Sequence, residues 1–60
     1  MSYKYIGTED IYGTDGTVLL VSNKVYKVDS EGNSFKIHSE SKTISTTEEY
    51  LKKNFALQVS

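Results

Sequence analysis

The side chains that could carry out chemistry are few and far apart in this chain. His38 is the only imidazole, and there is no cysteine. A metal site needs three or four converging ligands, and a nucleophilic triad needs a histidine beside an activated hydroxyl or thiol. His38 has no second imidazole or thiol to join it, and no strained nucleophile turn is visible. We therefore expect an exposed structural histidine, no metal or other cofactor, and no enzyme.

Two loops superficially resemble ligand-binding motifs. A calcium loop needs glycine at its sixth position, whereas the segment that begins at Asp29 has Gly32 at its fourth. The Gly-Thr-Asp-Gly segment at 13–16 lacks the Gly-Lys-Ser/Thr ending of a phosphate-binding loop. We interpret both segments as turns.

Tyrosine is the residue type best suited to binding in this chain. Five of the seven aromatic residues are Tyr, and this side chain is enriched at interfaces because one end packs while the hydroxyl hydrogen-bonds. Core or rim packing explains some of them equally well. We expect the first strand and the loop after it to lie side by side, and we predict partner contacts from Tyr3, Tyr5, Tyr12 and Asp15.

The elements that must position these residues are predicted to be short strands. The aromatic and branched residues of Tyr3–Ile6 indicate a first strand. Gly7–Thr17 has the composition of a long ordered loop, with a primed hairpin turn at Asp15-Gly16. We expect Ile11 or Tyr12 to anchor this loop in the core. The apolar run that follows, Val18–Val21, indicates a buried strand.

Alternating side chains then predict an antiparallel hairpin. Two strands, Val25–Asp29 and Ser34–His38, are expected on either side of a four-residue connection, Ser30–Asn33. Period-two alternation places one side chain in two toward the core. The residues expected to point inward are Tyr26, Val28, Phe35 and Ile37.

The last third of the chain predicts a short strand, one helical turn and a closing strand. Thr43–Ser45 is expected to be a strand, and Thr46 followed by Glu49 forms a capping-box pattern at a helix start. Asn54 is expected to end the helix in the left-handed conformation. The closing strand should carry Phe55, Leu57 and Val59 on one side.

This order of elements indicates an all-β fold in one domain, residues 1–60. It is the layout of a small SH3-like barrel of about five antiparallel strands with one short helical turn before the last strand. From Leu19 onward the chain resembles such barrels: the 20–28 segment is similar to a diverging turn leading into the second strand, and the 48–57 segment to the terminal helical turn and last strand.

More specifically, the chain resembles small, uncharacterised SH3-like proteins of phages and Firmicute bacteria. It rests on Lys-Val-Tyr-Lys-Val at 24–28, an Asp/Gly turn, a short strand and a terminal Tyr-Leu-x-x-x-Phe-x-Leu. Peptide-binding eukaryotic SH3 domains additionally carry a Trp pair and a Pro-x-x-Tyr motif, but this chain has no Trp and no Pro. The resemblance thus implies the architecture and a binding role, and it does not transfer a proline-rich ligand.

Charge and hydropathy exclude several classes of partner. The net charge is −1, and all seven basic residues are lysines. A surface that binds nucleic acid usually carries a stripe of basic residues and arginines that make bidentate contacts. The absence of both makes a nucleic-acid partner less favoured. No apolar segment predicts a signal peptide or a membrane span. We expect a cytoplasmic protein with no membrane partner.

We therefore expect a non-enzymatic protein-binding module, and the resemblance implies a phage or prophage factor that modulates a host protein complex. Two alternatives stay open. One is a weak single-stranded nucleic-acid binder that stacks tyrosines on bases beside Lys24, Lys27 and Lys36. The other is a structural protein that self-associates, for example as a homodimer, through an uncovered strand edge.

Overall fold

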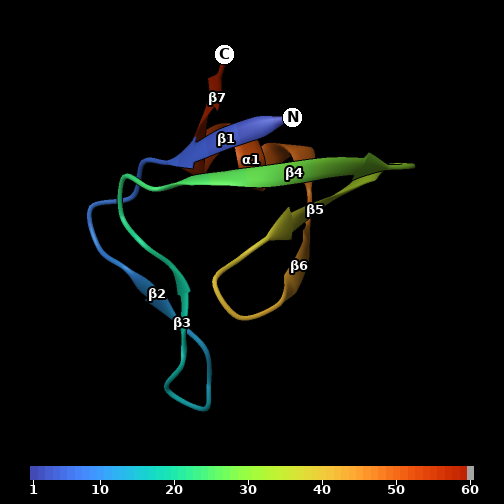
Figure 1. Cartoon of the computed structure of the whole chain (residues 1–60). Helices are drawn as coiled ribbons and strands as arrows, with labels where there is room; N and C mark the ends of the chain where they lie inside the picture. The colour runs from blue at the N-terminus through green and yellow to red at the C-terminus, as the bar shows by residue number, and fades with distance from the viewer. Residues whose placement is uncertain (60) are drawn as a thin grey trace.

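The computed structural model describes residues 1–59 and contains, within them, seven strands and one helix (Figure 1). Five of the strands form an antiparallel sheet in the order β6-β5-β4-β1-β7, and β2 pairs with β3. This strand order, with the helix directly before the last strand, confirms the predicted small SH3-like barrel. The elements are β1 (Ser2–Tyr5), β2 (Ile11–Tyr12), β3 (Val18–Leu20), β4 (Val25–Glu31), β5 (Ser34–His38), β6 (Thr43–Thr46), α1 (Glu48–Asn54) and β7 (Phe55–Gln58).

One face of the sheet supplies the core. The strand registers place Tyr3 opposite Tyr26 and place Val28 opposite Ile37, so alternate residues share the inner face. The predicted meeting of the middle hairpin and the last strand in one interior is confirmed, and Phe35 packs against it half-buried. The buried residues are Tyr5, Leu20, Tyr26, Val28, Ile37, Leu51 and Phe55.

The turn between β4 and β5 is shorter than expected. Glu31 pairs with Ser34, so the turn has two residues, Gly32 and Asn33, instead of the predicted four. Gly32 has φ of 61° whereas Asn33 has no positive φ. Positive φ at the first position alone is the pattern of a type II′ turn, which continues strand pairing up to the turn itself.

Among the non-glycine residues that the structure describes, the one with positive φ is Asn23, and not Asn54 as predicted. Asn23 has φ of 69° in the turn before β4, where its N–H donates to the Tyr5 carbonyl at 2.8 Å. Asn54 instead stays in α1, and its side-chain amide donates to the Tyr50 carbonyl at 3.0 Å. The helix ends because Phe55 is already extended and its N–H donates to the Leu51 carbonyl.

The helix begins one residue later than predicted. Thr47 is the N-cap, and its hydroxyl oxygen accepts from the Tyr50 N–H at 3.2 Å. Thr46 pairs with Phe35 in the β5–β6 ladder, which keeps its backbone extended. The predicted capping box of Thr46 and Glu49 is therefore wrong, because strand pairing at Thr46 outweighs the local capping pattern.

Candidate functional site

The most distinctive surface is a hairpin that leaves the rest of the sheet. Residues 7–22, the projecting hairpin, contain β2 and β3 and extend away from β1, β4 and β7 (Figure 1). Ile11 pairs with Leu20 across a bulge, and Tyr12 pairs with Val18. Of these hairpin residues, all of which are described, only Leu20 is buried.

The prediction that Ile11 or Tyr12 anchors this segment in the core is wrong. Ile11 is 36% exposed and Tyr12 is 62% exposed. The core position is filled by Leu20 from β3, and β2 pairs with β3 instead of packing on the sheet. Tyr12 is thus held on a paired strand with most of its side chain in solvent.

The tip of the hairpin is built around Asp15 and Gly16. The Gly16 N–H donates to the Gly13 carbonyl at 3.0 Å, and the Gly13 N–H donates to the Thr17 carbonyl at 2.8 Å. Within this tip, residues 13–17, positive φ occurs only at Gly16, where it is 86°. This is a three-residue turn with a bulge at glycine, and not the primed turn that was predicted.

Asp15 fixes the shape of this tip. Its carboxylate accepts from the Thr17 hydroxyl at 2.7 Å and from the Thr17 N–H at 3.1 Å. The hydrogen bond from the Thr17 hydroxyl, and after it the one from the Thr17 N–H, hold the pKa of Asp15 below its ordinary value. Asp15 is therefore an exposed carboxylate with its own structural partner.

The base of the hairpin is tied by polar side chains. The Ser22 N–H donates to the Asp10 carboxylate at 2.8 Å, and the Ser22 hydroxyl donates to the Gly7 carbonyl at 2.5 Å. The Tyr5 ring lies directly over Gly7, where a Cβ would stand 2.2 Å from the Tyr5 hydroxyl oxygen. Any side chain at this position would require the buried Tyr5 ring to move, so glycine is favoured here.

A second set of hydrogen bonds attaches β3 to the loop between β5 and β6. The Val21 N–H donates to the Tyr26 hydroxyl oxygen at 2.7 Å, and that hydroxyl donates to the Glu40 carboxylate at 3.0 Å. The Lys24 ammonium pairs with the same carboxylate. The Glu40 N–H donates to the Leu19 carbonyl at 3.0 Å. The hairpin is thus held at a fixed place on the barrel.

The carboxylate at this junction is stabilised in its charged form. Hydrogen bonds from Lys24 and then from Tyr26 lower the pKa of Glu40. Burial raises the pKa of Tyr26, the largest of the causes acting on it. Both shifts favour a neutral phenol that donates to an ionised carboxylate.

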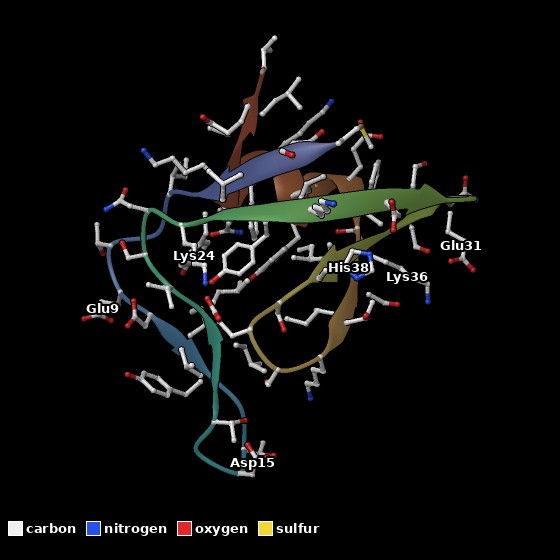
Figure 2. The ribbon with its side chains drawn as sticks, viewed as in Figure 1. Glu9, Asp15, Lys24, Glu31, Lys36 and His38 are labelled. Atoms are coloured by element: carbon white, nitrogen blue, oxygen red, sulfur yellow. The ribbon has the colours of Figure 1, made fainter. Side chains whose placement is uncertain are left out.

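Charge is unevenly divided between the projecting hairpin and the barrel. The hairpin holds three of the eight acids, Glu9, Asp10 and Asp15, and none of the seven lysines. Figure 2 shows Glu9 and Asp15 along the hairpin, with Lys36 and His38 on β5, away from it. The hairpin is therefore an acidic protrusion on a barrel with a surplus of lysines.

The structure separates the four residues predicted to contact a partner. Tyr12 and Asp15 lie on the projecting hairpin. Tyr5 is 4% exposed and packs against Phe55 with ring centroids 5.3 Å apart. Tyr3 is half-buried on β1 between β4 and β7. The first strand and the hairpin do not lie side by side as expected, because β1 is an inner strand of the sheet.

Three residues that were not predicted to belong to the site, Glu9, Asp10 and Tyr50, act on the buried Tyr5 hydroxyl. Burial raises the pKa of Tyr5, and the neighbouring Tyr50, Asp10 and Glu9 raise it further. Tyr50 is an exposed residue of α1 whose ring lies 6.4 Å from that of Phe55. The two acids are visible in the sequence as a local excess of negative charge, whereas nothing local in the sequence places Tyr50 near Tyr5 and Phe55.

Two of the three lysines named for nucleic-acid stacking lie on the outer face of the sheet, and the third, Lys24, pairs with Glu40. Lys27 alternates with buried Tyr26 and Val28 and so lies on the outer face of β4. Lys36 lies on the outer face of β5, with its ammonium 3.8 Å from the Glu31 carboxylate. His38 is exposed, as predicted, and its Nε2 lies 2.7 Å from an Asp29 carboxylate oxygen.

Comparison with protein-family models, with curated proteins and with solved structures found no match to this chain. Within residues 1–59 the structure has no pocket, and no three His, Cys, Asp or Glu side chains are grouped to hold a metal ion. In the same residues no helix is long and apolar enough to cross a bilayer. The projecting hairpin is therefore the candidate site on its geometry and charge.

Proposed function

We propose that this protein is a non-enzymatic module that binds another protein through its projecting hairpin. The observation that carries the proposal is Tyr12, which is 62% exposed yet fixed on a hydrogen-bonded strand. A rigid aromatic side chain offers a large contact area and loses little conformational freedom when it is covered.

The surroundings of Tyr12 support a protein partner with basic side chains. Ile11 adds apolar area beside it, and Glu9 is exposed on the same segment. Within the described residues Glu9 makes no hydrogen bond or ion pair, so its charge is available to a partner. Asp10 and Asp15 hold the hairpin in shape and add to its negative potential.

The contact set is narrower than the one predicted from the sequence. We assign the direct contacts to Tyr12, Ile11 and Glu9, and a shaping role to Asp15. Tyr5 belongs to the core, because a side chain that is 4% exposed cannot serve as a surface anchor. Tyr3 is half-buried on β1, where it pairs with Tyr26 of β4 and Leu57 of β7, and it is not part of the hairpin surface.

The biological role in the proposal is that of a phage or prophage factor that acts in the bacterial cytoplasm on a host protein complex. It is supported by the resemblance of the 24–28 segment and of the terminal Tyr-Leu-x-x-x-Phe-x-Leu to small SH3-like proteins of phages and Firmicute bacteria. The fold itself serves many functions, so the role depends on the hairpin surface and not on the barrel.

Single-strand nucleic-acid binding is less well supported. Base stacking needs exposed aromatic rings beside a cationic track. The exposed ring on the hairpin, Tyr12, is in the acidic part of the molecule, while Lys27 and Lys36 lie on the outer face of the sheet. Phosphates would therefore be repelled where stacking is available.

Affinity capture from a bacterial lysate tests the proposal. The bait is the full chain, compared with Tyr12→Ala, Glu9→Lys and a matched control, Val25→Ala, which truncates an exposed apolar side chain on β4. We expect the wild type and Val25→Ala to capture the same protein, and Tyr12→Ala and Glu9→Lys to lose it. Equal capture by all four baits would contradict the proposed surface.

A further inference from the structure

Strand β7 offers unpaired backbone groups along one side. It is the last strand of the sheet order, and its partner within residues 1–59 is β1. The Ile6 N–H donates to the Asn54 carbonyl at 2.9 Å, and antiparallel pairing then turns Ala56 and Gln58 toward β1 as well. By the same alternation, the backbone groups of Phe55 and Leu57 point away from β1.

The side chains along this edge are uncharged and, apart from Gln58, apolar. Leu57 is 56% exposed and Val59 is 90% exposed, and residues 55–59 contain no charged residue and no proline. Charged residues and prolines are the usual protection of an edge strand against pairing. The opposite edge, β6, exposes the polar side chains of Thr43 and Ser45.

We propose that two copies of this chain pair antiparallel through β7, with the two-fold axis at Leu57. This inference goes beyond the proposed function and concerns a separate surface. In this register the Leu57 N–H and carbonyl exchange hydrogen bonds with Leu57 of the second copy. The Val59 N–H of each copy donates to the Phe55 carbonyl of the other.

The register of this pairing follows because one backbone group of β7, the Phe55 N–H, already has a hydrogen-bond partner. The Phe55 N–H donates to the Leu51 carbonyl at the end of α1, so it cannot join a new ladder. A pairing centred on Ala56 would place the Leu57 carbonyl opposite that occupied N–H. The pairing centred on Leu57 uses the carbonyl of Phe55 and not its N–H. It gives a hydrogen-bond partner to the Phe55 carbonyl, to both backbone groups of Leu57 and to the Val59 N–H.

The side chains are self-complementary in the same register. Leu57 faces Leu57, and Phe55 faces Val59, all on the face that also carries Tyr3 beside Leu57. Ala56 faces Gln58 on the other face. No like charges oppose each other, which an isologous contact requires because each residue meets its own symmetry partner. These features favour a second copy over an unrelated peptide strand as the occupant.

Sedimentation velocity with charge-reversed variants tests this arrangement. We expect the wild type to shift from monomer to dimer as concentration rises, and Leu57→Glu and Leu57→Lys to be monomeric because each places like charges at the axis. An equimolar mixture of the two variants should form a heterodimer. The control Ser45→Glu, on the β6 edge, should dimerise like the wild type.

A second measurement uses the unaltered protein. The Leu57 amide should exchange its hydrogen more slowly as protein concentration rises, while the exchange of the Ala56 amide, already paired with β1, stays constant. A wild type that remains monomeric up to about 1 mM would overturn the proposal. Dimers that persist in both Leu57 variants, or a mixture that stays monomeric, would also overturn it.

Discussion

The barrel and the projecting hairpin are stabilised in different ways. The barrel buries seven hydrophobic residues in one interior, and six of them come from the five-stranded sheet and α1. The hairpin contributes Leu20 alone, and two strands with so little burial are marginal by themselves. Its shape depends instead on the hydrogen bonds of Asp10, Asp15, Tyr26 and Glu40. The barrel therefore provides most of the stability, and the exposed residues of the hairpin are not needed to form the core.

This division predicts that the largest loss of stability follows from truncation in the barrel. Ile37 is 0% exposed on β5. We expect Ile37→Ala to lower the free energy of unfolding by about 2–5 kcal/mol, measured by urea denaturation. Tyr12→Ala on the hairpin should change it by less than about 0.5 kcal/mol. Similar losses in the two variants would contradict the division.

The junction between the two regions should respond at an intermediate level. Tyr26→Phe keeps the buried ring but removes the hydroxyl that accepts from the Val21 N–H. We expect a loss of about 1–3 kcal/mol because that N–H is left without its partner. Hydrogen exchange at Val21 should accelerate more than exchange at Val28 in the barrel. Uniform acceleration at both amides would show that hairpin and barrel open together.

The tip of the hairpin should show a smaller effect. Gly16→Ala places a side chain at φ of 86°, which costs about 1–2 kcal/mol. We expect amide chemical shifts to change around Asp15 and Thr17 while those of the core strands stay in place. Thr14→Ala, at an exposed residue of the same turn, is the control and should leave the spectrum nearly unchanged. An equal response in Thr14→Ala would contradict a specific requirement for glycine at position 16.

The smallest effect should be a pH dependence at Glu40. Its pKa in the folded protein lies below the ordinary value of 4.5, chiefly because Lys24 and Tyr26 donate to it. The contribution of Glu40 to the free energy of unfolding is then complete above pH 4.5, and it is lost as the pH falls through the folded-state pKa. We expect Glu40→Gln to melt below the wild type at neutral pH and to converge with it once the pH falls below the lowered folded-state pKa of Glu40. A constant difference across this range would contradict the assigned hydrogen bonds.

Side-chain alternation predicted the barrel well and the hairpin poorly. Tyr26, Val28 and Ile37 are inward because two long strands repeat the same pattern, which a sequence shows directly. The hairpin depends on contacts between distant residues, such as the Ser22 N–H with Asp10. No local pattern encodes those, so the sequence leaves open whether Tyr12 packs in the core or contacts a partner.

The candidate site was predictable only in part, for the same reason. Tyrosine enrichment pointed to Tyr12, but it pointed equally to Tyr5, which the pairing of β1 with β4 and β7 places in the core. The position of Tyr50 depends on where α1 begins, and strand pairing at Thr46 leaves Thr47 as the N-cap. Long-range pairing thus determines which aromatic side chains remain on the surface.

The most direct test of the central claim is the dissociation constant of the captured partner, measured by calorimetry for the wild type and Tyr12→Ala. The account predicts a loss of about 2 kcal/mol or more, roughly thirtyfold in Kd, with an unchanged free energy of unfolding. Equal dissociation constants for the two proteins, with the hairpin folded in both, would contradict the claim that the hairpin is the binding surface.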